Sequence, residues 1–125
     1  MYFYTIKIFA LMIADLKYLQ QMTGNDGAMM KEMIELFLNQ LAGLREDIVI
    51  LLDNKNWVEL SRMAHKIKSS SLVMGVMPMV NDMKELELLA KEGKNTDMYP
   101  DYIARFHSMS DTVKKELNSF LDSTN

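Results

Sequence analysis

The sequence predicts an all-α protein, an antiparallel up-down four-helix bundle with an additional N-terminal helix. Apolar residues recur at the helical spacing of three and four residues, and no stretch shows sustained β-like alternation. Glycine, asparagine and aspartate separate these stretches in short polar turns. Short connections between long amphipathic helices favour antiparallel neighbours, which is the arrangement of an up-down bundle.

Length and composition fit one globular domain over residues 1–125. A chain of 125 residues is enough for one core and too short for two full-sized domains. Its 49% hydrophobic and 25% charged residues are typical of a soluble protein. Without cysteine it forms no disulfide and no thiolate metal site, and its net charge of -3 argues against nucleic-acid binding. We therefore expect a cytoplasmic protein that binds neither nucleic acid nor membrane.

Residues 1–13 form an apolar run that resembles a targeting segment only superficially. Lys7 interrupts the run, no basic cluster precedes it, and a bilayer span needs roughly 20 apolar residues. We expect an N-terminal extension or a helix that packs on the bundle.

The first helix is expected to end near Met22, before a turn that contains Gly24 and Gly27. The second helix spans residues 28–53, and either Asn54 or Asn56 is suited to cap the helix that follows. Its apolar stripe consists of Met30, Met33, Ile34, Phe37, Leu41, Leu44, Ile48 and Leu52.

The third helix spans residues 57–74 and stops at Gly75. The fourth begins near Pro78, which suits a first helical position, and closes at Gly93, which suits a position just past a helix end. The last helix follows residues 94–97. Its apolar stripe consists of Ile103, Phe106, Ser110, Val113, Leu117 and Phe120.

The third helix carries a histidine on its polar side. At about 100° per residue from Leu60, the buried stripe of this helix lies within roughly 60°. His65 lies about 140° away from the same reference, so it points outward. The stripe consists of Trp57, Leu60, Met63, Ala64, Ile67, Ser71 and Met74.

The neighbours of His65 suggest phosphoryl chemistry. Ser61 and Ser69 lie four residues to either side and Lys68 three residues on, so all of them reach one small, polar, cationic patch. A neutral imidazole attacks an electrophilic phosphorus without prior deprotonation, and Lys68 can offset the charge of the attached group. The short side chain of Ser69 leaves room for a partner's active site to close over the ring.

These residues resemble the signature of the histidine-containing phosphotransfer (HPt) family of two-component phosphorelays. The signature has a histidine, Lys at plus three, small residues at plus five and plus six, and Gly at plus ten. Here these are His65, Lys68, Ser70, Ser71 and Gly75. Ala64, Trp57 and the order of the helices resemble the family as well. The family usually has Gly where this chain has Ser69, which bears on partner preference.

The resemblance implies a phosphocarrier and not a stand-alone enzyme. A receiver domain bearing a phosphorylated aspartate would dock on the third helix, His65 would take the phosphoryl group, and a second receiver would accept it. Response-regulator receiver domains and a hybrid histidine kinase are the implied partners of a monomer, and the receivers would supply Mg²⁺, with no cofactor bound here. Arg62, Lys66 and Leu72 are the further candidates for docking contacts, beside Ser61 and Ser69.

Three other interpretations compete with a relay. The phosphoacceptor domain of a histidine kinase usually has an acidic residue after its histidine, where this chain has Lys66, and a Pro a few residues later, whereas none precedes Pro78. A metal-binding bundle needs clustered His and Glu ligands, such as a Glu three residues before a His on an inward face. Arg62 and Ala104 hold those positions here, so no metal site is predicted. A non-phosphorylated interaction module fits the helical pattern, and only the surroundings of His65 argue against it.

Overall fold

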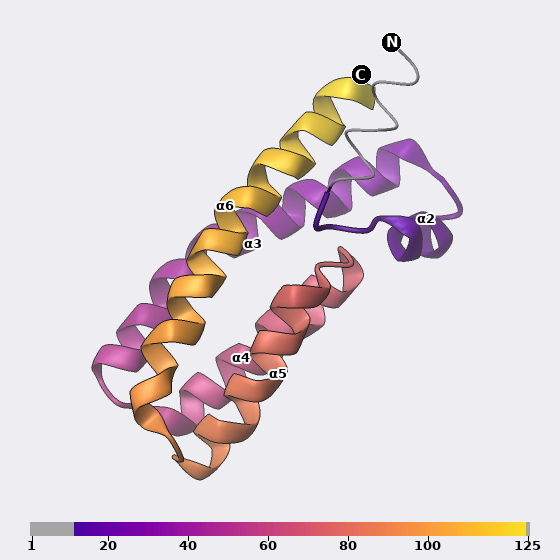
Figure 1. The fold of residues 1–125 in the computed structure, drawn as a ribbon. Helices are drawn as coiled ribbons and strands as arrows, with labels where there is room; N and C mark the ends of the chain where they lie inside the picture. Colours follow the sequence, from indigo (N-terminus) through magenta and orange to yellow (C-terminus); the bar gives the residue numbers. More distant parts are fainter. Residues whose placement is uncertain (1–11, 125) are drawn as a thin grey trace.

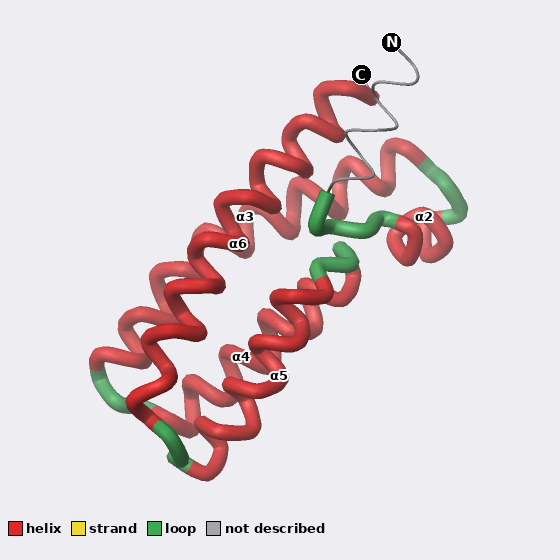
Figure 2. Tube along the Cα trace, viewed as in Figure 1, coloured by secondary structure: helices red, strands yellow, loops and turns green. Residues whose placement is uncertain are grey.

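The computed structural model describes residues 12–124, which form helices joined by short turns (Figures 1 and 2). In chain order these are α2 (Lys17–Thr23), α3 (Gly27–Asp53), α4 (Trp57–Val73), α5 (Met77–Glu92), the 3-10 helix η1 (Thr96–Met98) and α6 (Tyr99–Thr124). The predicted all-α class is confirmed. The helix proposed for residues 1–13 lies almost wholly outside the described residues, and Met12 and Ile13 are not helical.

Four long helices form the bundle. α3 packs against α4 and α6, and α5 packs against the same two helices, so the four close into a ring. Consecutive helices run antiparallel, as Figure 1 shows. α3 and α6 have 27 and 26 residues, whereas α4 and α5 have 17 and 16. At 1.5 Å per residue, α3 is about 40 Å long and α4 about 25 Å, so one end of the bundle has room for a further layer.

That layer consists of residues 12–16, here called the strap, and of α2 (Figure 1). The backbone N–H groups of Ile13 and Ala14 donate to the carboxylate of Glu116 on α6, at 2.9 and 3.1 Å. The N–H of Asp15 donates to the carbonyl of Met74 at the end of α4, at 3.2 Å. The strap therefore ties the last helix to the turn between α4 and α5.

Local sequence explains the helix ends. Asp26 caps α3 by accepting a hydrogen bond from the N–H of Met29, and Asn56 caps α4 by accepting one from the N–H of Glu59. Of the two asparagines considered for the second role, Asn56 is the cap. Gly24 and Gly93 end α2 and α5 in the left-handed conformation, as their positions predicted.

The core lies where the four apolar stripes meet. The predicted stripe of α3 is buried apart from the half-buried Met33 and Leu52, and the stripe of α6 is buried apart from the half-buried Phe120. His107, beside the α6 stripe, is half-buried, and its Nε2 lies 3.0 Å from the carbonyl oxygen of Arg45. The periodicity therefore predicted the inward faces of these helices correctly.

Candidate phosphotransfer site

α4 presents His65 on the side opposite its buried stripe. Leu60 and Ala64 are fully buried and Ile67 is 1% exposed, whereas the side chain of His65 is 59% exposed. Ser71 is buried on the same stripe and donates its hydroxyl to the carbonyl of Ile67 at 2.7 Å. A small residue at this position lets α4 pack closely, so the helix holds His65 outward on a rigid support.

A carboxylate from α5 holds the imidazole ring. Nδ1 of His65 lies 3.0 Å from Oε2 of Glu87, whose side chain is 22% exposed. A carboxylate only accepts hydrogen bonds, so Nδ1 carries the hydrogen of this contact. In the neutral ring the lone pair is then on Nε2, so Nε2 is the ring nitrogen that is able to act as a nucleophile.

The same carboxylate binds the lysine of the motif. Nζ of Lys68 lies 2.8 Å from Oε1 of Glu87, and the Lys68 side chain is 26% exposed. The hydrogen bond from Lys68 is the largest influence on the pKa of Glu87 and lowers it below its ordinary value. Partial burial opposes this change, and the hydrogen bond from His65 adds to it. Glu87 is therefore an ionised acceptor shared by His65 and Lys68.

Glu87 corrects the predicted character of the patch. The sequence predicted a small, polar, cationic patch, but the structure places an acidic group between His65 and Lys68 and covers much of the lysine. Glu87 lies 22 residues from His65 on another helix, so helical spacing within α4 cannot find it. Its one signal in the sequence is its position directly after Leu86, at the border of the buried stripe of α5.

Ser61 requires a second correction. It was predicted beside His65 on the open side of the helix, but it is only 8% exposed because α5 covers this flank of α4. Its hydroxyl donates to the backbone carbonyl of Glu87 at 2.8 Å. Ser61 therefore positions the segment of α5 that carries the carboxylate, and it offers little surface to a partner.

The other predicted docking residues lie on the surface. Leu72 is 51% exposed, two helical turns beyond His65. Lys66, Ser69 and Arg62 are exposed, Ser70 is half-buried, and Arg62 pairs with Glu59 at 2.6 Å. The open surface beside the ring thus contains the short side chain of Ser69 and the exposed apolar side chain of Leu72.

The close approach of the strap requires a glycine at position 75. Its φ is +65°, and a Cβ built on it would lie 2.0 Å from the carbonyl oxygen of Asp15 in the strap. Only a residue without a side chain allows the strap to approach the turn so closely. The glycine therefore shapes the end of the α4–α5 hairpin and does not contact the ring.

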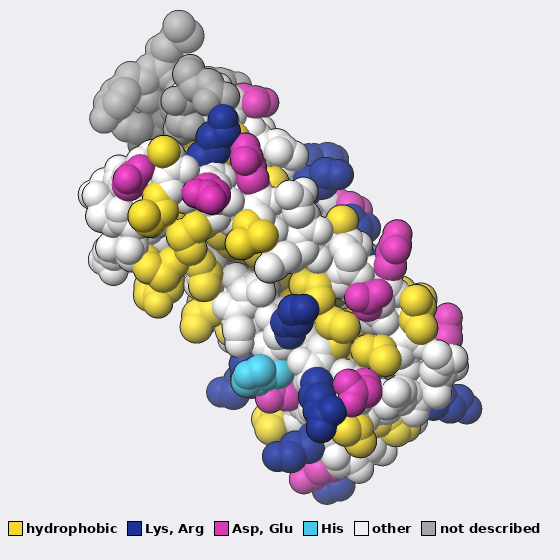
Figure 3. Space-filling model, turned by 180° about the vertical axis from the view of Figure 1, so that it is seen from behind, with side chains coloured by type: hydrophobic (Ala, Val, Ile, Leu, Met, Phe, Trp, Pro, Cys, Tyr) yellow, Lys and Arg dark blue, Asp and Glu magenta, His cyan; other side chains and the backbone are white. Residues whose placement is uncertain are grey.

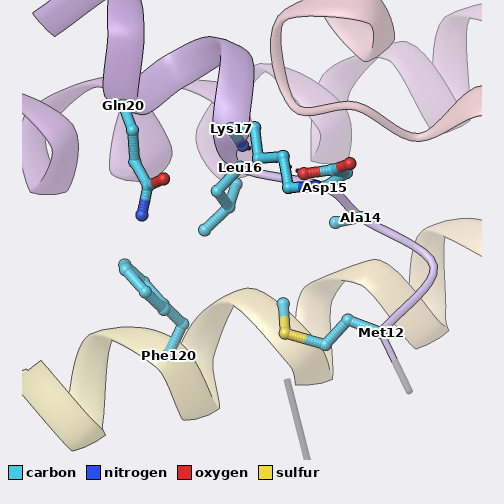
Figure 4. A pocket seen from close by; sticks show the side chains of 7 residues that line it. All are labelled: Met12, Ala14, Asp15, Leu16, Lys17, Gln20 and Phe120. Carbon is cyan, nitrogen blue, oxygen red and sulfur yellow. Dashed lines mark hydrogen bonds between the residues drawn. The ribbon is translucent and has the colours of Figure 1, made fainter. Parts of the chain in front are cut away.

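A separate hollow of about 350 Å³ lies at the strap end of the bundle. Figure 4 shows Leu16, Gln20 and Phe120 around it, from the strap, α2 and α6. No residue of α4 lines it, so it does not belong to the surroundings of His65. Within residues 12–124, no helix is long and apolar enough to cross a membrane, and no cluster of three His, Cys, Asp or Glu side chains is placed to bind a metal.

Comparison with known proteins identifies the family. The family model of the Hpt domain matches residues 32–119, which include most of α3, all of α4 and α5, and most of α6. The chain is an Hpt domain. Hpt domains are phosphocarrier modules of two-component signalling, and they interact with receiver domains and kinases. No curated protein and no solved structure matches the chain.

Proposed function

We propose that this Hpt domain accepts a phosphoryl group on Nε2 of His65 from the phospho-aspartate of a receiver domain and passes it to a second receiver. The observation that carries the proposal is the arrangement of His65, Glu87 and Lys68. The ring is exposed, its Nδ1 is held at 3.0 Å by an ionised carboxylate, and an ammonium group lies on the same carboxylate. A solvated surface histidine without a role needs none of these contacts.

The transfer of the phosphoryl group to His65 needs no base to remove a proton first. The lone pair of Nε2 forms the N–P bond as the bond between phosphorus and the aspartyl oxygen breaks, and the electron pair leaves with the receiver's carboxylate. The ring becomes cationic and keeps its hydrogen on Nδ1, where Glu87 accepts it. A carboxylate in this position stabilises an imidazolium and fixes its orientation. Glu87 is thus a positioning residue, and His65 is the residue that forms the bond.

Lys68 supplies positive charge next to the incoming group. A phosphoryl group adds a charge of about -1.5 to -2 near neutral pH. The ammonium group is already within 2.8 Å of Glu87, so it is close to the ring before any phosphoryl group arrives. The chain itself supplies no metal or catalytic pocket in this scheme. The receiver contributes Mg²⁺ and the groups that activate the phospho-aspartate.

The test is phosphoryl transfer from a kinase-phosphorylated receiver to the purified domain, followed as acid-labile phosphate. Transfer to wild type should disappear in His65→Gln with the helical circular dichroism signal intact. His107→Gln is the matched control, because His107 is the second histidine of the chain and lies outside the patch. If no receiver from the same genome transfers phosphate to wild type, the domain is an interaction module and the proposal fails.

A further inference from the structure

A hollow of about 370 Å³ opens beside His65 between α4 and α5. It lies toward the start of α4 and the end of α5, away from Leu72. Its walls are formed by Val58, Ser61, Arg62, His65, Glu87 and Lys91. A partner that covers the imidazole ring must therefore cover this hollow as well.

The two cationic side chains on the walls of the hollow, Arg62 and Lys91, are at most weakly neutralised by the described part of the chain. Lys91 is exposed and forms no ion pair with any residue in the described part of the chain. Among the described residues Arg62 pairs with Glu59 alone, one turn away on the same helix, and its side chain is 73% exposed, so this pair is weak. Glu87, the one carboxylate among the described residues that line the walls, is already bound to His65 and Lys68. The hollow is locally cationic in a chain whose net charge is -3.

The surface on the other side of His65 is apolar. Leu72 and Met77, near the turn between α4 and α5, are 51% and 48% exposed, and Tyr18 and Met22 of α2 are exposed at the same end of the bundle. Figure 3 shows hydrophobic side chains gathered near the grey residues, and Lys and Arg side chains around a histidine farther along the same face. The surface that surrounds the nucleophile is therefore apolar on one side and cationic on the other.

We infer that the hollow receives an acidic side chain of the docking receiver, next to its phosphorylated aspartate, and that this contact sets the orientation of the receiver. The inference rests on the proposed function. The Lys91 ammonium, which pairs with no described carboxylate, and the Arg62 guanidinium, whose exposed pair with Glu59 is weak, are suited to a carboxylate of a partner. A partner that covers the hollow also reduces the screening of these charges by water. Opposite charges across an interface mainly accelerate association and reject wrongly oriented or wrongly charged partners. Receivers that lack an acidic residue at this edge are then poor donors.

The test is a charge reversal at Lys91, on the wall of the hollow. Lys91→Glu is compared with Lys115→Glu, a matched change at an exposed lysine of α6 that does not line the hollow. The measured quantity is kcat/KM for transfer from the phosphorylated receiver, at low and at moderate salt. Each value is divided by the rate at which phosphoramidate, a small phosphoryl donor, labels His65 in the same variant. Circular dichroism confirms that both variants are folded.

We expect Lys91→Glu to lower this ratio by about tenfold at low salt, and the loss to shrink as salt screens the charges. An Asp or Glu of the receiver, changed to Lys, should restore transfer to Lys91→Glu and not to wild type. If Lys91→Glu and Lys115→Glu give the same ratio at every salt concentration, the inference is wrong while the carrier role of His65 stands. If neither the receiver nor phosphoramidate labels wild type, the proposed function itself fails.

Discussion

Replacing Gly75 with alanine should destabilise the domain by about 3 kcal/mol, which is much more than the same change at Gly24. Both glycines have a left-handed backbone, with φ of +65° and +61°. Alanine in this conformation costs about 1 kcal/mol. At Gly24 no atom lies within 4 Å of the added Cβ, so this backbone cost is the whole expected effect.

At Gly75 the strap adds a second cost. The added Cβ would meet the carbonyl oxygen of Asp15 at 2.0 Å and its carbonyl carbon at 2.8 Å, and both are backbone atoms that a rotamer change cannot move. The strap must retreat and lose the hydrogen bond from the Asp15 N–H to Met74, which contributes about 1 kcal/mol. Looser packing of Ala14 and Leu16, which are 6% and 9% exposed, costs about 1 kcal/mol more.

Urea unfolding of both variants, followed by circular dichroism, measures the difference directly. Gly43→Ala is a useful third variant, since Gly43 lies inside α3 with nothing within 4 Å of an added Cβ. It should stabilise the domain by about 0.5 to 1 kcal/mol through helix propensity. Equal losses for Gly75→Ala and Gly24→Ala would show that the strap moves away without cost, and would refute the role given to this contact.

The remaining predictions concern the Glu87 contacts. Because the pKa of Glu87 is lowered, its ionised carboxylate stabilises the fold at pH values above 4.5, the ordinary pKa of the group. This contribution is lost as the pH falls through the lowered pKa. Urea unfolding at a series of pH values should therefore show that Glu87→Gln loses less stability than wild type on acidification. Glu87→Gln should also slow transfer about tenfold or more, because a hydrogen bond to a charged group contributes about 1.5 to 3 kcal/mol. Nitrogen NMR should find the neutral His65 ring as the Nδ1–H tautomer in wild type and as a mixture of the Nδ1–H and Nε2–H tautomers in Glu87→Ala, and an unchanged tautomer would contradict the positioning role. Lys68→Ala should slow transfer or shorten the lifetime of phosphohistidine and destabilise the fold by about 1 kcal/mol or less, since a partly exposed ion pair is lost. Ser61→Ala should cost about 1 kcal/mol in thermal unfolding through the lost hydrogen bond to α5, and no change would remove that bond from the packing.

Helical periodicity in the sequence determined the fold class and the direction of His65, and the capping residues and glycines determined the helix ends. These properties depend on neighbours within a few residues. The repeat of 3.6 residues per turn sets which face of α4 is apolar. Asn56 caps the start of α4 and Gly93 ends α5, both through contacts with adjacent backbone. The outward position of His65 followed from its angle to Leu60 alone, and its exposed side chain agrees with that angle.

Only the tertiary structure decided what surrounds the ring. The packing of α5 on α4 buries Ser61, brings Glu87 within hydrogen-bond distance of His65 and Lys68, and forms the hollow that Lys91 borders. The strap gives Gly75 its close contact in the same way, from a position 60 residues earlier in the chain. Periodicity specifies which face of a helix is buried, but it does not specify the rotation and height at which two helices meet. The exposed histidine was therefore visible in the sequence, and the carboxylate that contacts its ring was not.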